Sequence, residues 1–129
     1  MDDCIFCKIT KGEISSAKVY EDSDFFAFLD INPVSKGHTL LVPKEHIRWI
    51  FDGDNAMIEK IFKTAKNLND KIKLGLSCDY VQLVITGEQI PHAHIHLIPS
   101  YFGNETAKWN KASYASEIEI SDYLEKIKF

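Results

Sequence analysis

The chain has 129 residues, of which 45% are hydrophobic and 26% charged, and its formal net charge is −4. This size fits one domain with its own core. The acidic balance argues against a nucleic-acid-binding protein, because phosphate backbones are gripped by clustered Lys and Arg side chains. The first residues are acidic and no long apolar run follows, so neither export nor a membrane span is indicated. We therefore expect a cytoplasmic protein whose three cysteines stay reduced.

Hydrophobic spacing and turn residues predict the elements along the chain. In order, they are a helical turn at 4–11, strands at 19–21, 25–29 and 38–42, a long helix at about 54–73, strands at 80–86 and 92–98, and a helix at 116–128. Strands that precede and follow one long helix, without βαβ alternation, predict an α+β domain with an antiparallel sheet of about five strands. We treat residues 1–129 as a single domain, with a core over about 4–99 and a C-terminal extension over 100–129 that includes a loop around Trp109.

The long helix is the clearest element. Asp54 is the expected N-cap, and Gly75 is expected to end the helix. Its inward stripe, at helical spacing, comprises Ile58, Ile61, Phe62, Ala65, Leu68 and Ile72.

Residues 92–98 read HAHIHLI and place three of the five histidines in strict alternation. Side chains alternate between the faces of a strand, so we expect the imidazoles on one face and the apolar side chains on the other. A single strand histidine is usually a polar residue without a special role. Three in alternation favour a function, because imidazole typically acts as acid, base, nucleophile or metal ligand. Two interpretations remain open, namely direct metal binding by the row and covalent phosphoryl chemistry.

Cys4 and Cys7 are spaced as CxxC, which lets two thiolates reach one Zn²⁺. The alternatives are two small buried side chains or a redox pair, although thioredoxin-like redox motifs belong in a βαβ setting that is not found here. If the pair binds zinc, a tetrahedral site needs two more ligands. His46 and His92 are available, which would leave the other two histidines of the row for chemistry. Cys78 has no cysteine neighbour in sequence and is interpreted as a small buried hydrophobe.

Four blocks of the sequence together resemble the histidine-triad (HIT) superfamily of nucleotide hydrolases and transferases. The row at 92–98 fits its signature of three histidines alternating with hydrophobic residues. The other blocks are CIFCKI from position 4, AFLDINP from position 27 and GHTLLVPKEH from position 37. Their order and spacing are those of the bacterial, Hint-like branch with a zinc-binding CxxC. The resemblance fades beyond Ser100.

The resemblance implies a reaction at the α-phosphate of a nucleotide. His94, the middle histidine, is then the nucleophile, and a main-chain carbonyl near the first histidine holds the proton on its other nitrogen. His96 would contact the phosphate and the leaving group, with His38 at the same site. Water would hydrolyse the labile P–N bond and release a nucleoside monophosphate, normally AMP. Zn-containing relatives imply the same four ligands for a structural zinc, Cys4, Cys7, His46 and His92.

The resemblance also implies a nucleotide pocket around Asp30, whose carboxylate would accept hydrogen bonds from ribose hydroxyls. The alternative is that Asp30 and Asn32 merely shape the turn before Pro33. The expected residues around the base and ribose are Asp30, Ile31, Asn32, Phe6, Ile9 and Phe28.

The loop at 86–91, TGEQIP, departs from the family pattern because it is short. Glu88 stands where a glutamine is expected, and an anionic side chain near a phosphate disfavours binding. Gln89 is the better candidate for a phosphate or leaving-group contact.

Three hypotheses follow. The first is a hydrolase or nucleotidyl transferase acting on purine nucleoside phosphoramidates or dinucleoside polyphosphates. The second is a nucleotide-binding interaction module with little turnover. The third is a metalloenzyme with zinc on the histidine row, in which Cys4→Ser keeps the metal while His94→Ala and His96→Ala remove it. Relatives of this branch commonly pair into homodimers that extend one sheet across both protomers, so the resemblance also implies a homodimer.

Overall fold

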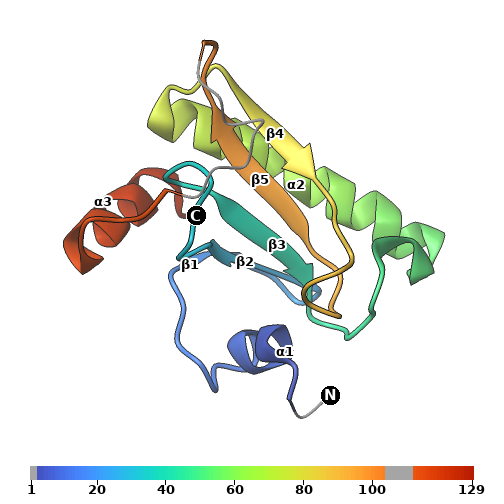
Figure 1. Cartoon of the computed structure of the whole chain (residues 1–129). Helices are drawn as coiled ribbons and strands as arrows, with labels where there is room; N and C mark the ends of the chain where they lie inside the picture. Colours follow the sequence, from blue (N-terminus) through green and yellow to red (C-terminus); the bar gives the residue numbers. More distant parts are fainter. Residues whose placement is uncertain (1–2, 104–111) are drawn as a thin grey trace.

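The computed structural model, which describes residues 3–103 and 112–129, has the expected α+β architecture (Figure 1). Its elements are α1 (Ile5–Thr10), β1 (Lys18–Glu21), β2 (Phe25–Leu29), β3 (Thr39–Pro43), a 3-10 turn (Ile50–Asp52), α2 (Asn55–Leu76), β4 (Tyr80–Val84), β5 (Ile95–Ser100) and α3 (Glu117–Ile127). The five strands form one antiparallel sheet in the order β1-β2-β3-β5-β4. The predicted fold class is confirmed.

Helices cover both faces of the sheet. The long helix α2 lies along one face and the short helix α1 lies against the other (Figure 1). Strand β2 shows the resulting pattern, because Phe25, Ala27 and Leu29 belong to the core under α2 while Phe26 and Phe28 belong to a second core beside α1. Strands β2 and β3 are therefore buried along their whole length.

The helix α2 follows the predicted apolar stripe with one exception. Asp54 caps its first turn by accepting a hydrogen bond from the Met57 N–H at 2.8 Å. Ile61 and Leu68 are fully buried, whereas Phe62 is 37% exposed because it stands one residue off the inward stripe. Neither α2 nor any other helix in the described part of the chain combines the length and apolarity needed to cross a membrane.

The prediction that Gly75 ends α2 is wrong. The helix continues to Leu76, and Ser77 ends it in the left-handed conformation with φ 54°. A Cβ atom on Gly75 would overlap the backbone carbonyl of Lys126 in α3. The glycine therefore serves the close approach of two helices rather than helix termination.

The strand predicted over 92–98 forms only from Ile95 onward, as β5. In the antiparallel register of β3 and β5, Pro43 would be the next partner of Ala93. Proline has no N–H to donate, so pairing stops there, and the Ala93 N–H bonds instead to the carbonyl of Ile47 at 2.7 Å.

Two other strands have limits one or two residues from the predicted 38–42 and 80–86, since β3 spans Thr39–Pro43 and β4 ends at Val84. Shifts of this size are usual at element ends.

The C-terminal helix α3 forms as expected, and the chain end returns to the sheet. Ile127 is fully buried in the core under α2. The Phe129 N–H donates to the carbonyl of Val19 at 2.9 Å, and its ring packs on Tyr20 with centroids 5.0 Å apart. The expected loop around Trp109 lies outside the described residues.

We expect Gly75→Ala to lower the free energy of unfolding by about 2 kcal/mol, although alanine favours a helix over glycine by about 1 kcal/mol. The added methyl group collides with the Lys126 backbone, which cannot move away without lifting Ile127 from the core. Urea unfolding measures the change. Leu74→Ala, at a position 81% exposed on the same turn, is the control and should change stability little. A Gly75→Ala protein as stable as the wild type would contradict the tight packing of α3.

Candidate active site and metal centre

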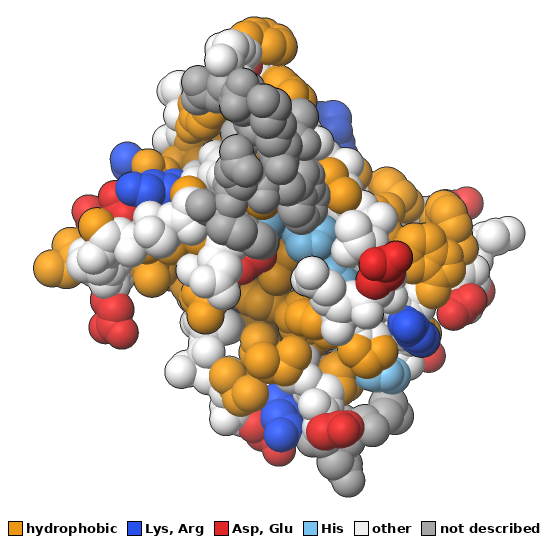
Figure 2. Space-filling model, viewed as in Figure 1, with side chains coloured by type: hydrophobic (Ala, Val, Ile, Leu, Met, Phe, Trp, Pro, Cys, Tyr) orange, Lys and Arg blue, Asp and Glu red, His pale blue; other side chains and the backbone are white. Residues whose placement is uncertain are grey.

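The histidines gather on the α1 face of the sheet. His38, His92, His94 and His96 are all buried, and His46 is half-buried. Histidine side chains show at the centre of this face, beside a broad hydrophobic area (Figure 2). The residues that alternate with the histidines, Ala93, Ile95 and Leu97, belong to the core under α2. The predicted alternation thus persists even where the ladder has ended.

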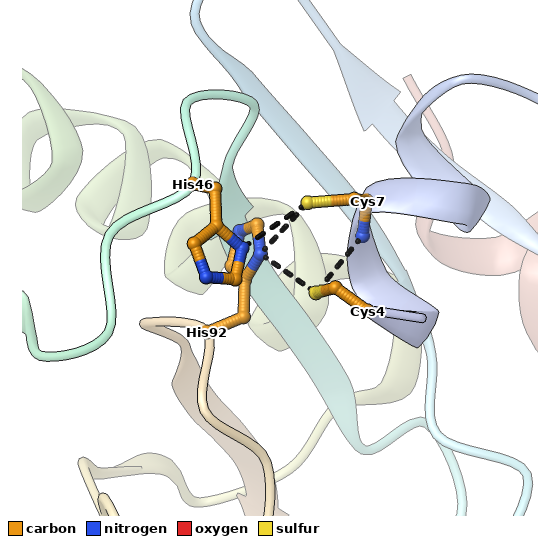
Figure 3. A group of neighbouring side chains, drawn as sticks. All are labelled: Cys4, Cys7, His46 and His92. Carbon is orange, nitrogen blue, oxygen red and sulfur yellow. Dashed lines mark hydrogen bonds between the residues drawn. The ribbon is translucent and has the colours of Figure 1, made fainter. Parts of the chain in front are cut away.

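Cys4, Cys7, His46 and His92 bring their ligand atoms within 4.8 Å of one another (Figure 3). The Cys7 Sγ lies 3.2 Å from His46 Nδ1 and 3.5 Å from His92 Nδ1, and the Cys4 Sγ lies 3.3 Å from His92 Nδ1. A tetrahedral zinc ion with its usual bond lengths separates S and N ligands by about 3.5 Å. The structure therefore brings together the four predicted ligands in a cluster that could bind a metal ion.

The cysteine pair is placed by α1. Cys4 is the N-cap of this helix, and its Sγ accepts a hydrogen bond from the Cys7 N–H at 3.4 Å, so one helical turn sets both thiols on the same side. Burial raises the pKa of the Cys7 thiol, and its hydrogen bond with Cys4 raises it further. A metal ion that binds here must displace a proton from Cys7.

The His92 ring is turned toward the thiols by a backbone carbonyl. Its Nε2 lies 2.8 Å from the carbonyl oxygen of Pro43. Because a carbonyl can only accept, Nε2 carries the proton and Nδ1 presents its lone pair to the cysteines. Burial lowers the pKa of His92, against the opposing effect of the Pro43 carbonyl, and so favours the neutral form that binds metals.

The next histidine has the opposite tautomer. The Nδ1 of His94 lies 2.7 Å from the carbonyl oxygen of His92, so Nδ1 carries the proton and Nε2 keeps its lone pair. The Phe6 ring stands edge-on to the His94 ring, with centroids 5.2 Å apart. A neutral imidazole held in this way has the arrangement that a nitrogen nucleophile requires.

His38 and His96 form a hydrogen-bonded pair beside His94. The Val34 N–H donates to His38 Nδ1 at 3.1 Å, so the proton of a neutral His38 is on Nε2. This Nε2 lies 2.9 Å from His96 Nδ1 and donates to it, which leaves the proton of a neutral His96 on Nε2. The rings of His94 and His96 have centroids 5.0 Å apart, so both can reach one substrate group.

Asp30 joins this pair, with Oδ2 at 3.8 Å from His38 Nε2, and the three side chains form a second group that could hold a metal ion. A metal on His38 Nε2 needs a lone pair there. The Val34 N–H already donates to Nδ1, so metal binding would require a doubly deprotonated imidazole. The geometry favours a hydrogen-bonded pair and argues against a metal ion held by Asp30, His38 and His96.

The residues predicted to wall the base lie in the buried cluster beside α1. Phe6 contacts Phe28 edge-to-face at 5.5 Å between centroids, and Ile9 belongs to the same cluster. Phe6 also touches His94, so this apolar wall adjoins the expected nucleophile.

The predicted ribose segment follows β2. Ile31 and Asn32 are exposed, and the Asp30 Oδ1 accepts a hydrogen bond from the Asn32 N–H at 2.9 Å. Asp30 therefore does shape the turn before Pro33, while its other oxygen faces His38. A turn-forming role and a ribose-binding role are compatible at this carboxylate.

The short loop at 86–91 is held by residues that the sequence did not single out. Arg48 donates to the carbonyl of Gly87 at 3.1 Å, and the Trp49 ring lies against the same glycine, where a Cβ would come within 3.1 Å of it. Glu88 and Gln89 are exposed. The phosphate contact of Gln89 stays a prediction.

Comparison with known proteins gives a consistent result. A model of the HIT domain family matches residues 11–103. The chain is 41% identical over 108 residues to an uncharacterized HIT-like protein of Borreliella burgdorferi, covering 78% of each. It is 39% identical over 100 residues to an adenosine 5'-monophosphoramidase of Saccharomyces cerevisiae, covering 74% of this chain and 61% of that protein. A crystal structure of a Hit-like protein from Bartonella henselae superposes with a TM-score of 0.85 at 28% identity, covering 99% of this chain and 96% of that one. The chain belongs to the HIT family.

We expect nitrogen-15 NMR of the imidazoles at alkaline pH to show His94 as the Nδ1–H tautomer, and His92 and His38 as the Nε2–H tautomer. The three backbone hydrogen bonds described above impose these forms. An Nε2–H signal from His94 would contradict the assigned role of the His92 carbonyl.

Proposed function

We propose that this protein is a nucleotide hydrolase or nucleotidyl transferase that cleaves at the α-phosphate of purine nucleoside phosphoramidates or dinucleoside polyphosphates and releases AMP. The observation that carries the proposal is His94, whose Nδ1 proton is held by the His92 carbonyl while its Nε2 lone pair stands beside His96. Membership of the HIT family and the likeness to a yeast adenosine 5'-monophosphoramidase support the substrate class.

The mechanism has two displacements at phosphorus. Nε2 of His94 attacks, the P–N bond forms and the bond to the leaving group breaks, while the His92 carbonyl stabilises the positive charge on the imidazole. When the His38–His96 pair holds an additional proton, it passes that proton to the leaving nitrogen or oxygen through His96. The pair takes a proton back from the water that then breaks the P–N bond, and AMP leaves.

Substrate binding uses the surfaces beside this nucleophile. In the proposal Phe6, Ile9 and Phe28 wall the base, and Asp30, with Ile31 and Asn32, holds the ribose. Gln89 contacts a phosphate or the leaving group. The closeness of the Phe6 ring to His94 supports the base position, because an α-phosphate bound at His94 leaves the nucleoside near that ring.

We propose that the cluster of two cysteines and two histidines binds a structural zinc ion. The spacing of the four ligand atoms, the burial of both thiols and the neutral His92 support zinc. A bound zinc would cross-link α1, the segment after β3 and the segment before β5. It would thereby hold His92, whose carbonyl positions the nucleophile.

A nucleotide-binding module with little turnover is the second candidate. The observation in its favour is the short loop before the histidine row, where Glu88 and Gln89 are exposed. Binding of AMP without turnover of any phosphoramidate or dinucleoside polyphosphate would favour it.

We also propose a homodimer located in the cytoplasm. Strand β4 is an edge strand of the sheet, and its Tyr80 and Leu83 are each 41% exposed. An exposed apolar edge strand is a surface on which a second copy could extend the sheet. Size-exclusion chromatography with light scattering gives the oligomeric state directly.

Mixing the protein with an adenosine phosphoramidate should yield AMP and an adenylylated protein, and His94→Ala should lose both. The variant lacks the attacking nitrogen, so we expect a rate loss of at least about 10³-fold. Mass spectrometry of the intact protein and of its peptides locates the adduct. Turnover that persists in His94→Ala, or an adduct on another residue, would contradict the assignment.

Cys4→Ser should lose bound zinc and melt at a lower temperature, because serine is a poor zinc ligand and the cross-link is lost. His96→Ala should keep the metal. Cys78→Ser is the matched control, since Cys78 is also buried but lies outside the cluster. Elemental analysis measures the bound metal, and thermal unfolding measures the stability. If His96→Ala loses the metal while Cys4→Ser keeps it, the metal is bound by the histidine row instead. Zinc affinity should fall as the pH is lowered, because the raised pKa of Cys7 favours its protonated thiol.

A further inference from the structure

The start of the C-terminal segment contacts the loop that follows β2. The Ala112 N–H donates to the carbonyl of Pro33 at 2.7 Å. The Tyr114 hydroxyl accepts a hydrogen bond from the Gly37 N–H at 2.9 Å. A third contact is the ion pair between Lys36 and Glu119 at 2.9 Å. Three points of the segment 112–119 therefore contact three points of the loop 33–37.

This loop carries groups of the proposed active site at both of its ends. Asp30 and His38 are joined across the loop by a hydrogen bond from the Asp30 N–H to the His38 carbonyl at 2.9 Å. Inside the loop, the Val34 N–H sets the tautomer of His38, and the Ser35 carbonyl accepts from the His38 N–H. The backbone path of this loop therefore determines where the carboxylate and the imidazole point.

Gly37 is the tightest point of the loop. Its φ is +95°, and a Cβ atom there would press on the side chains of Leu76 and Pro99. Its buried N–H finds its acceptor in the Tyr114 hydroxyl rather than in the sheet. An unmet buried N–H is costly, so the hydroxyl favours this one loop conformation over others.

The segment 112–119 is itself held in place by α3. The Tyr114 ring packs on Tyr123 of α3 with centroids 5.9 Å apart, and α3 ends with Ile127 in the core. The chain end pairs with β1 through the Phe129 N–H. The segment 112–129 therefore forms a strut between the β1 edge and the loop.

We propose that Tyr114 is a positioning residue that, through Gly37, holds the loop carrying Asp30 and His38, so that the C-terminal segment is part of the nucleotide site. The inference rests on the proposed function, because it assigns Asp30 to the ribose. Its consequence is that the Tyr114 hydroxyl contributes to affinity for the ribose hydroxyls without touching the nucleotide.

The test compares wild type with Tyr114→Phe, which removes the hydroxyl and keeps the ring. Calorimetry measures binding of AMP and of 2',3'-dideoxyadenosine 5'-monophosphate. We expect Tyr114→Phe to weaken AMP binding by about five- to tenfold and the dideoxy nucleotide by much less, because Asp30 has no ribose hydroxyls to hold in the latter. The KM of an adenosine phosphoramidate should rise by a similar factor.

Tyr20→Phe is the matched control, since the Tyr20 hydroxyl also makes a hydrogen bond, to Asp22 at 2.6 Å, but on the β1–β2 turn. It should leave both affinities unchanged. Equal affinities of wild type and Tyr114→Phe, equal losses for both nucleotides, or a lower kcat at unchanged KM would each overturn the proposal. A wild type that neither binds AMP nor turns over the phosphoramidate would instead refute the proposed function.

Should Tyr114→Phe fail to fold, the same two affinities are measured in Glu119→Gln, which weakens another contact between the segment and the loop. It breaks only the half-exposed ion pair with Lys36, and glutamine can still accept from the Ala115 N–H that Glu119 binds at 2.7 Å. The expected loss of AMP affinity is about twofold, again greater than the loss for the dideoxy nucleotide. If this variant changes the affinities for the two nucleotides equally, the proposal is overturned.

Discussion

The hydrogen bonds of His92 connect the cluster of two cysteines and two histidines to the proposed nucleophile. The side chain of this buried residue donates from Nε2 to the Pro43 carbonyl and turns Nδ1 toward Cys4 and Cys7. Its own carbonyl oxygen holds the Nδ1 proton of His94. A buried imidazole is stable only when its nitrogens are engaged, so a shift of His92 would leave polar groups unsatisfied on both sides. The position of the proposed nucleophile thus depends on His92, a residue to which the proposed mechanism assigns no reacting atom.

Pro43 explains why its own carbonyl is available to an imidazole. In a continued ladder between β3 and β5, the carbonyl of residue 43 would accept a hydrogen bond from the N–H of residue 93. Because proline has no N–H to donate in return, the ladder ends, and the Pro43 oxygen accepts from the His92 imidazole instead. Ala93 meanwhile bonds to Ile47, in the segment that carries His46. The shortening of β5 therefore creates the hydrogen bond that sets the tautomer of His92.

Side-chain patterns made much of the site predictable. The alternation at 92–98 placed the imidazoles opposite the core, and CxxC spacing with two available histidines grouped the four residues that the structure brings together. The patterns assigned no site role to Val34, Pro43 and Gly37, because these residues contribute a backbone N–H or carbonyl to the site rather than a side chain. The sequence likewise misplaced the end of α2. Glycine is a residue type that commonly follows the end of a helix, but the close approach of α3 to Gly75 is a tertiary contact that local spacing does not encode.

In our proposals, the tail beyond Ser100, where the family resemblance fades, affects nucleotide affinity and not the chemistry. The histidines of the proposed reaction lie on the sheet face and are held by the cluster and by backbone carbonyls, to which the described residues of the tail contribute no group. The loop from Asp30 to His38 is instead held from outside, by Tyr114 and by the pair of Lys36 with Glu119. We therefore expect changes in the tail to alter the position of the proposed ribose-binding segment while His94 keeps its tautomer. A chain end anchored by Ile127 in the core makes such a strut stiff enough to act on the loop.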